Sequence, residues 1–197
     1  MVATGTANVA SVVAAFERLG ARPRPVERAD EVRTCERLVL PGVGAFGAAA
    51  RGLVERGLFE PLRERIASGG RTLAICVGMQ LLFEGSEESP DATGLGILPG
   101  RLERFDDALE VPQMGWNRME AAPGCRWLET GWVYFANSFR RAAEPGPLDE
   151  PLSRGAHAEY GGRFLAGCEW NECLACQFHP ELSGAVGRRI LARWWEE

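Results

Sequence analysis

The stretch from Thr72 to Phe83 constrains the fold more than any other part of the sequence. Its first apolar residues, Leu73 to Ile75, predict a short buried strand. Cys76 follows directly, Gly78 comes two residues later, and a helical pattern runs from Met79 to Phe83. A strand, a sharp turn and a helix with a reactive side chain at the turn form a nucleophile elbow, which needs small residues beside the turn. The sequence therefore predicts Cys76 as a candidate nucleophile, in a position where a following helix N-terminus favours a thiolate.

Cys76 alone has a simpler explanation, because a free cysteine in an apolar strand usually serves as a small buried side chain. A second segment favours catalysis. His179 and Glu181 stand two residues apart, and the bond to Pro180 favours an extended segment, so both side chains can point the same way. A cysteine nucleophile needs a base, and the base needs an orienting group. We therefore predict a triad of Cys76, His179 and Glu181.

These two motifs and three further stretches resemble one protein family. Residues 76–80, Cys-Val-Gly-Met-Gln, and residues 179–181, His-Pro-Glu, are similar to the motifs of class I, or triad, glutamine amidotransferases. Residues 41–47 resemble the oxyanion strand of that family. Residues 111–117, Val-Pro-Gln-Met-Gly-Trp-Asn, and residues 177–184 resemble the branch formed by the glutaminase subunits of imidazole glycerol phosphate synthases, from histidine biosynthesis. The resemblance covers nearly the whole chain, and the stretch 111–117 is its most specific part.

The resemblance implies a reaction without a cofactor or a metal. L-glutamine is hydrolysed to glutamate and ammonia, and backbone N–H groups around the nucleophile form the oxyanion hole. The expected oxyanion-hole residues are Gly42, Val43, Gly44 and Val77. The expected substrate-binding residues are Gln80, Glu88 and Ser138, of which Gln80 and Glu88 hold the α-amino end of glutamine.

The resemblance also implies a partner. Ammonia is expected to pass to a (β/α)8 cyclase subunit of imidazole glycerol phosphate synthase, with which the chain forms a heterodimer. Asn8 and Trp116 are expected near the interface through which ammonia leaves, although Asn8 can equally be a helix cap and a lone tryptophan is usually a core residue.

Two regions depart from the family pattern. Asn137 and Phe139 stand where the family often has histidine and tyrosine, so we expect a different wall of the substrate cleft around Ser138. At the N-terminus only residues 1–3 remain for the first strand, so either the sequence starts late or this member has a shortened first strand.

Strands and helices alternate along the chain, which predicts an α/β fold with three layers. We expect one domain over residues 1–197, with a mostly parallel central sheet and helices on both faces, similar to class I glutamine amidotransferases and to flavodoxin. Helices are expected near residues 9–19, 46–56, 59–67 and 183–195. Strands are expected near residues 25–27, 38–40, 95–105, 111–120 and 133–139, and residues 163–178 are expected to form a hairpin.

Composition excludes several classes of protein. The net charge of −5 and the lack of a basic tract argue against nucleic-acid binding. No apolar run approaches the roughly 18 residues of a membrane span, and no signal peptide opens the chain, so we expect no membrane partner. Six cysteines without such a signal favour a reducing cytoplasm over a disulfide framework.

Four alternatives remain at this stage. The spacing of Cys173, Cys176 and His179 can suit zinc, but a strand turns residues three apart to opposite faces, which favours packing. The chain can instead be a different class I amidotransferase, such as the glutaminase of pyridoxal phosphate synthesis. It can be a Cys-His hydrolase of peptides, although the Gln80 and Glu88 pair suits an amino acid. It can also be a binding module that has lost activity, although the triad is intact.

Overall fold

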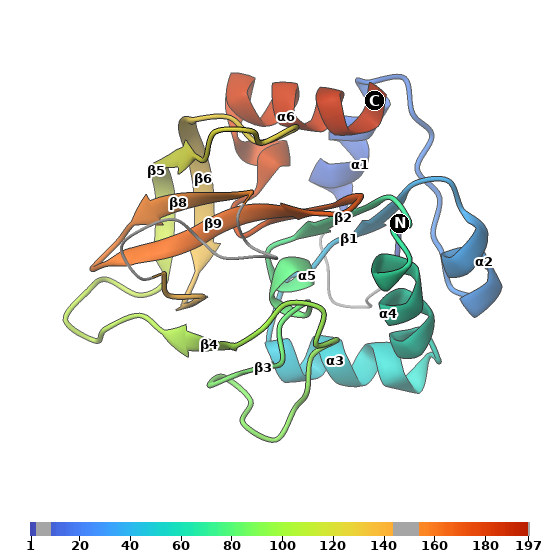
Figure 1. The fold of residues 1–197 in the computed structure, drawn as a ribbon, viewed down its shortest axis with the longest axis horizontal. Coiled ribbons are helices and arrows are strands. Elements are labelled where there is room, and N and C mark those ends of the chain that lie inside the picture. Colours follow the sequence, from blue (N-terminus) through green and yellow to red (C-terminus); the bar gives the residue numbers. More distant parts are fainter. Residues whose placement is uncertain (3–8, 144–153, 197) are drawn as a thin grey trace.

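The computed structural model describes residues 1–2, 9–143 and 154–196 (Figure 1). Helices and strands alternate, as expected, only up to residue 80, because the described part of residues 85–176 forms strands with no helix between them. The helices are α1 (Ala10–Glu17), α2 (Ala29–Thr34), α3 (Phe46–Glu55), α4 (Phe59–Ala67), α5 (Val77–Gln80), α6 (Gly184–Glu196) and the 3-10 helix η1 (Pro180–Leu182). The strands are β1 (Leu38–Leu40), β2 (Thr72–Ile75), β3 (Gly85–Ser86), β4 (Arg101–Arg104), β5 (Gln113–Ala121), β6 (Gly131–Asn137), β7 (Phe139–Arg140), β8 (Gly155–Glu159), β9 (Arg163–Trp170) and β10 (Cys173–Cys176).

The main sheet is mixed, which corrects the expectation of a mostly parallel sheet. Its order is β1-β2-β10-β9-β8-β5-β6, and only the β1–β2 and β2–β10 pairs are parallel. Every other pair is antiparallel. The burial of the strands explains the difference. The three parallel strands are buried along their whole length, whereas β5 and β6 alternate between the core and solvent, as antiparallel strands with one covered face do. Apolar runs in the sequence locate such strands but do not give their direction.

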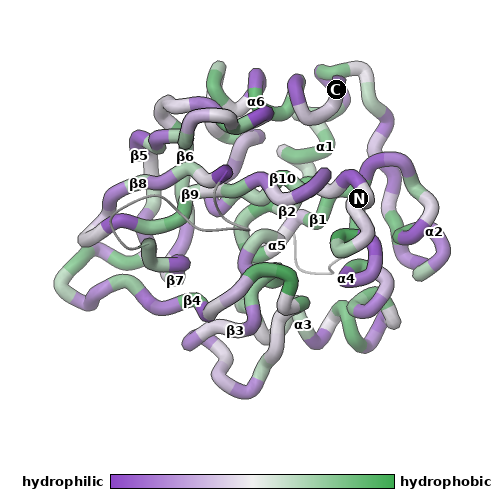
Figure 2. Tube along the Cα trace, viewed as in Figure 1, coloured by the Kyte–Doolittle hydropathy of each residue, from purple (hydrophilic) through white to green (hydrophobic). Residues whose placement is uncertain are grey.

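Helices cover both faces of the parallel strands, which confirms the three-layer α/β class. The helices α1 and α6 lie on one side of β1 and β2, and α3 and α4 lie on the other (Figure 1). The hydropathy of the chain follows this arrangement, because the central strands are apolar and the surrounding helices alternate between apolar and polar residues (Figure 2). The core between the layers is built from large side chains that are almost wholly buried, among them Trp127, Trp194, Phe46, Phe83, Phe135 and Phe178.

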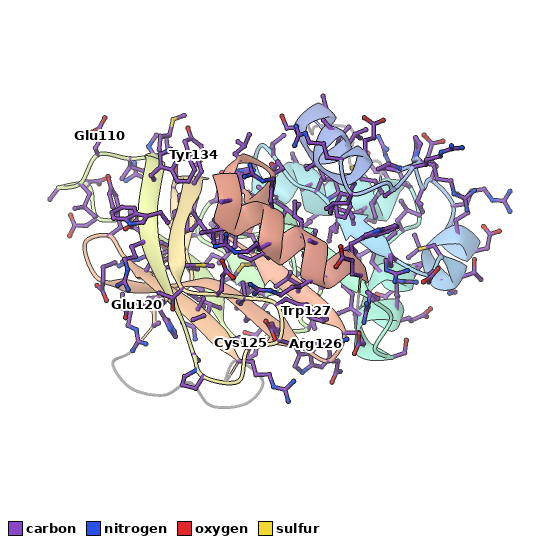
Figure 3. All side chains as sticks on the ribbon, turned by 90° about the horizontal axis from the view of Figure 1, so that it is seen from above. Glu110, Glu120, Cys125, Arg126, Trp127 and Tyr134 are labelled. Atoms are coloured by element: carbon purple, nitrogen blue, oxygen red, sulfur yellow. The ribbon has the colours of Figure 1, made fainter. Side chains whose placement is uncertain are left out.

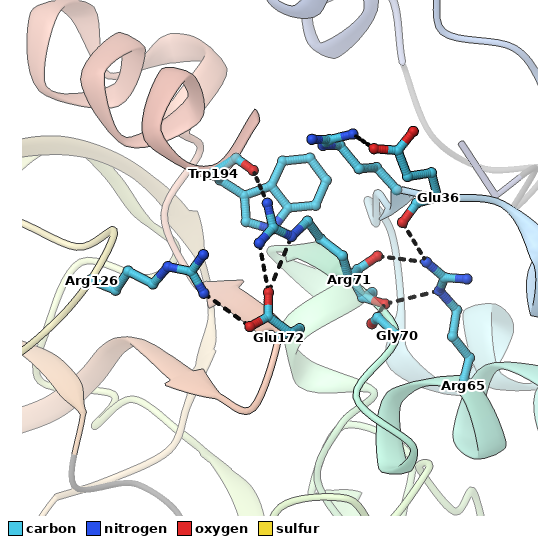
Figure 4. Close-up of polar contacts among 9 residues, drawn as sticks. Glu36, Arg65, Gly70, Arg71, Arg126, Glu172 and Trp194 are labelled. Carbon is cyan, nitrogen blue, oxygen red and sulfur yellow. Dashed lines mark hydrogen bonds and ion pairs between the residues drawn. The ribbon is translucent and has the colours of Figure 1, made fainter. Parts of the chain in front are cut away.

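An ion-pair network fixes the amino ends of β2 and β10. Arg71 and Glu172 immediately precede these two strands, and the Nη2 of Arg71 lies 2.7 Å from the Oε2 of Glu172 (Figure 4). Arg126 contacts the other carboxylate oxygen at 2.9 Å. The parallel pairing of β2 with β10 begins at the next residues, where Thr72 lies opposite Cys173. Because parallel strands share one direction, the residues that follow β2 and β10 emerge together at the opposite edge of the sheet.

The N-terminal strand is short in the part of the chain that the structure describes. Val2 forms a single bridge with Val26 and donates a hydrogen bond to the carbonyl of Val39 at 2.9 Å. The rest of the expected first strand, and Asn8 with its expected roles, lie outside the described residues. The helix α1 begins at Ala10 after Val9, without a side-chain cap. Within the described residues, no helix is long and apolar enough to cross a membrane.

The cysteines of β10 are buried free thiols. Burial raises the pKa of Cys173 to about 12 and raises the pKa of Cys176 well above its usual range. No group of three or more His, Cys, Asp or Glu side chains in the described ranges is arranged to hold a metal ion.

Candidate active site

Cys76 occupies the sharp turn between β2 and α5. Its backbone has φ 52° and ψ −113°, in the region that favours glycine. Residues held in such a conformation are concentrated at functional sites. Gly78 permits the turn, because a Cβ on it would lie 2.1 Å from the backbone oxygen of Leu40. The helix α5 ends at Gln80, before the expected end near Phe83. The turn after it is tighter, because the N–H of Leu82 donates to the carbonyl of Met79, three residues back.

The loop after β1 packs directly against this elbow. A Cβ on Gly42 would lie 2.3 Å from the backbone nitrogen of Gly78 and 2.7 Å from the carbonyl carbon of Val77, so only glycine fits there. Gly44 has a positive φ of 91°. The four residues predicted for the oxyanion hole therefore lie close together. Gly42 packs behind the elbow, and Val43, Gly44 and Val77 line the cavity beside Cys76.

His179 is held by its backbone as well as by its side chain. Its N–H donates to the carbonyl of Tyr134 at 2.8 Å, and its carbonyl accepts from the Oγ of Ser183 at 2.6 Å. The same Oγ accepts from the N–H of Tyr134 at 2.9 Å, which ties β6 to the start of α6. These three hydrogen bonds fix the place of the imidazole ring relative to the sheet.

The imidazole of His179 is paired with the carboxylate of Glu181. Its Nδ1 lies 2.8 Å from the Oε1 of Glu181, and both side chains are at least nine-tenths buried. Burial lowers the pKa of His179, but hydrogen bonds to Cys76 and to Glu181 outweigh it and raise that pKa to about 10. A protonated imidazole between a sulfur and a carboxylate matches the arrangement of an activated cysteine nucleophile.

One cavity of about 450 Å³ brings most of the sequence-predicted site residues together. It is lined by Val43, Gly44, Cys76, Val77, Gln80, Glu88, Met114, Tyr134, Ala136, Asn137, Ser138, Phe139, His179 and Leu182. Glu181 lies behind His179 and does not line the cavity. Trp116 lies outside the cavity, half-exposed, with its ring edge-on to that of Tyr134 at 6.1 Å between centroids.

The carboxylate of Glu88 marks the polar end of the cavity. Its Oε2 accepts a hydrogen bond from the N–H of Phe46, the first residue of α3, at 2.5 Å. A helix N-terminus stabilises a negative charge, so this contact holds the carboxylate in place. Gln80 supplies an amide to the same cavity. A carboxylate, an amide and a cysteine in one cavity can hold a small amino acid and attack its side chain.

Several residues of the site were not predicted. Tyr134, Met114, Ala136 and Leu182 line the cavity, but a lone tyrosine and three apolar side chains carry no distinct chemical signature in the sequence. Gln177 is buried, and its amide contacts both Cys76 and Gln80. Its position two residues before His179 was the available signal, since residues two apart on an extended segment share a side.

A Cys-His-Glu arrangement on an α/β fold is typical of enzymes with a cysteine nucleophile, and comparison with known proteins identifies the family. The model of the family "Glutamine amidotransferase class-I" matches residues 5–195. The chain therefore belongs to the class-I glutamine amidotransferases.

Relatives within this family share the name of one enzyme subunit. The chain is 40% identical over 199 residues to the imidazole glycerol phosphate synthase subunit HisH of Deinococcus radiodurans, covering 98% of this chain and 90% of the relative. It is 41% identical over 188 residues to the HisH subunit of Thermus thermophilus, covering 95% and 91%. It is also 38% identical over 194 residues to imidazole glycerol phosphate synthase hisHF of Emericella nidulans, covering 93% of this chain but 35% of that protein.

Solved structures support the fold. One described as a crystal structure of glutamine amidotransferase matches with a TM-score of 0.77 and 21% identity, covering 99% of this chain and 96% of the other. The structure of PurLQS from Thermotoga maritima contains a chain that matches with a TM-score of 0.72 and 17% identity, covering 99% and 95%. At these identities the likeness establishes the fold, and the fold alone.

Proposed function

We propose that this chain is the glutaminase subunit of an imidazole glycerol phosphate synthase. It hydrolyses L-glutamine and passes the ammonia to a separate cyclase subunit. The observation that carries this proposal is the buried His179–Glu181 pair on the wall of the cavity that Cys76 lines from its strained elbow. Identity of about 40% over nearly the whole length to proteins named HisH supports the choice among amidotransferases. The free state of all six cysteines supports a cytoplasmic setting.

Catalysis begins with attack of the Cys76 thiolate on the carboxamide carbon of glutamine. A carbon–sulfur bond forms, and the carbonyl electron pair moves onto oxygen. When the carbonyl re-forms, the carbon–nitrogen bond breaks and the imidazolium of His179 gives its proton to the departing nitrogen, so ammonia leaves and a thioester remains. Neutral His179 then takes a proton from water, whose oxygen attacks the thioester carbon. The carbon–sulfur bond breaks, which regenerates the Cys76 thiolate beside the imidazolium and releases glutamate. Glu181 orients the ring and stabilises its charged form.

The oxyanion of each tetrahedral intermediate needs backbone donors. The N–H of Val77 and an N–H of the Gly42–Gly44 loop lie next to Cys76 and fill this role in the proposal. The positive φ of Gly44 lets the peptide after Val43 turn, so the loop can hold either an N–H or a carbonyl toward the substrate. One missing donor costs roughly 10²–10³ in rate. We therefore expect the isolated chain to be a slow glutaminase that its partner activates.

Substrate recognition depends on the polar end of the cavity. Glu88 pairs with the α-ammonium group of glutamine, and Gln80 fixes its orientation through the side-chain amide. The backbone around Ser138 completes the wall, with the carbonyl of Ser138 already bonded to the N–H of Phe105 at 3.0 Å. Asn137 stabilises this wall, because its Nδ2 donates to the carbonyl of Phe139 at 3.0 Å.

The partner docks over the mouth of the cavity. Three large apolar side chains are exposed around it, namely Met114, Trp116 and Leu182, with exposed fractions of 67%, 54% and 44%. Exposed apolar clusters of this kind indicate a protein interface. Tyr134 belongs to the same rim and lies well away from the loop that carries Cys125, Arg126 and Trp127 (Figure 3). The Emericella relative is nearly three times the length matched here, which fits fusion of the two subunits. We propose a (β/α)8 cyclase as the partner, with Trp116 in the interface.

The test is steady-state glutamate release by the chain alone, with the cyclase, and with the cyclase and its nucleotide ligand. We expect release to rise by about 10²-fold or more when all components are present. Equal kcat in the three conditions would contradict activation by the partner. With the Cys76→Ala chain in the complex, an ammonium salt at alkaline pH should still support the cyclase reaction. Activation by a pyridoxal phosphate synthase in place of the cyclase would assign the chain to a different amidotransferase.

A further inference from the structure

Gln177 is a buried polar residue that lies next to the nucleophile without lining the cavity. It is 1% exposed and follows β10 directly. Its Nε2 lies 3.8 Å from the Sγ of Cys76, in the range of an N–H···S hydrogen bond. Its Oε1 accepts from the Nε2 of Gln80 at 3.1 Å. A buried amide that is bonded at both of its ends has a fixed orientation.

The direction of this hydrogen-bond chain is set by a backbone carbonyl. The Nε2 of Gln80 lies 3.4 Å from the carbonyl oxygen of Phe139, which can only accept. The amide nitrogen of Gln80 must therefore face both Phe139 and the oxygen of Gln177. That contact leaves the nitrogen of Gln177 facing the sulfur of Cys76. We call the sequence of contacts Phe139 carbonyl–Gln80–Gln177–Cys76 the amide relay.

We propose that Gln177 is a positioning residue for the Cys76 thiolate and that Gln80 holds it in the donating orientation. An N–H donor aimed at the sulfur stabilises the thiolate and fixes its rotamer, because charge-assisted hydrogen bonds are the stronger ones. Gln80 also lines the substrate cavity, so the relay connects the residue that meets glutamine with the atom that attacks it. This role of Gln177 rests on the proposed glutaminase function, although the protonation of Cys76 can be measured in the absence of glutaminase activity.

The experiment measures the alkylation rate of Cys76 by iodoacetamide between pH 5 and 9, read by mass spectrometry of the Cys76 peptide, without glutamine. The titratable groups around Cys76 are His179 and Glu181 after β10, Cys176 on β10, and Glu88 across the cavity. In Gln177→Met, which keeps the size of the side chain but removes the donor, we expect the alkylation midpoint to rise by about one pH unit. We expect kcat in the cyclase complex to fall about tenfold, with KM changed much less.

Gln80→Met tests the relay itself and stays informative even if Gln177→Met does not fold. With the relay, Gln80→Met shifts the alkylation midpoint in the same direction in the absence of glutamine, because Gln177 is then free to turn. If Gln80 only grips the substrate, its alkylation profile stays as in the wild type. The matched control is Thr72→Val. Thr72 begins β2, the strand that Cys76 follows, and its buried hydroxyl donates to the carbonyl of Gly70 at 2.8 Å, at the other end of that strand from the thiol.

A wild-type alkylation profile in Gln177→Met overturns the proposal, and a wild-type profile in Gln80→Met overturns the relay. A chain that lacks glutaminase activity with every partner, but still shows these shifts, contradicts the proposed function and leaves the role of Gln177 intact. Gln177→Glu provides a second check. A carboxylate has the same shape and no donor, so it should slow alkylation more than methionine does.

Discussion

His179 and Glu181 form a buried pair in which Nδ1 lies 2.8 Å from Oε1, although the two residues are separated by a proline that starts a 3-10 helix. The extended backbone of His179, with ψ 95°, turns its ring toward the cavity, and the short helix returns the carboxylate behind the ring. We expect Glu181→Gln to lower kcat by about 10–10²-fold and Glu181→Ala to lower it further, since orientation and charge support are both lost. Glutamate release in the cyclase complex measures the effect. The control is Glu129→Gln, at a partly exposed carboxylate that pairs with Arg189 and Arg193.

The pKa values of the two histidines, His157 and His179, are predicted to differ widely. Hydrogen bonds to Cys76 and Glu181 raise the pKa of His179 to about 10 against the effect of burial, whereas burial and Arg163 lower the pKa of His157 to about 4. Titration of the two imidazole signals by NMR resolves both values. In Cys76→Ala the His179 signal should titrate at a lower pH, because the larger of its raising contacts is gone. Two titrations near 6.5 would contradict this arrangement.

The lowered pKa of His157 makes the free energy of unfolding depend on pH. Below about pH 6.5 the imidazole of His157 is protonated in the unfolded chain but stays neutral in the folded chain. The free energy of unfolding therefore falls as the pH drops from 6.5 toward 4. The slope from one such group is at most about 1.4 kcal/mol per pH unit. Urea denaturation at several pH values measures it. His157→Gln should flatten the dependence in this window, and an unchanged slope would show that other groups cause it.

Glycine at the elbow is required by contact distances. Gly78→Ala would place a Cβ 2.1 Å from the oxygen of Leu40, and Gly42→Ala would place one 2.3 Å from the nitrogen of Gly78. We expect each to lower stability by about 1–3 kcal/mol or more and to disturb the Cys76 backbone, so glutaminase activity should fall with it. Gly57→Ala is the control, because Gly57 has φ 65° but no atom within 4 Å of its added Cβ. Its cost should be confined to about 1–2 kcal/mol of backbone strain.

The loop at residues 126–128 depends on one buried carboxylate. Glu169, 3% exposed, accepts hydrogen bonds from the N–H groups of Arg126, Trp127 and Leu128, each at 2.7 Å. Glu169→Gln replaces one acceptor oxygen with an NH2 group, which cannot accept a hydrogen bond from these N–H groups. We therefore expect the free energy of unfolding to fall by about 2–4 kcal/mol. Glu172→Gln, at the more exposed carboxylate of the neighbouring network, should lose about 1 kcal/mol or less. Equal losses would contradict the ranking.

The structure brings Cys76, His179 and Glu181 together, as the sequence predicts, and their catalytic roles stay predictions. Cys76 is marked by its neighbours on both sides, and His179 and Glu181 are two residues apart. The expected extended segment is not what aligns this pair, because residues Pro180–Leu182 form the 3-10 helix η1. The strands at 38–40, 133–139 and 163–178 and the helices α3, α4 and α6 are likewise confirmed, because their apolar periodicity is strong.

Non-local pairing is what the sequence does not give. The antiparallel half of the sheet, which corrects the expected parallel one, depends on which strands meet across the molecule. The contact between Gln80 and Gln177 joins residues 97 positions apart, and no local pattern encodes it. The rim formed by Met114, Trp116 and Leu182 also arises only when β5 and the 3-10 helix η1, two segments far apart in the sequence, meet beside the cavity.

The central claim is that Cys76 is the nucleophile of a glutamine-specific site, and covalent trapping tests it most directly. The chain in its cyclase complex is incubated with a glutamine analogue that carries an electrophilic carbon in place of the carboxamide, and the adduct is located by peptide mass spectrometry. The triad predicts one adduct per chain, on Cys76, which free glutamine suppresses and which forms much more slowly in His179→Ala. An adduct on any of the other five cysteines, or none on Cys76, would contradict the assignment.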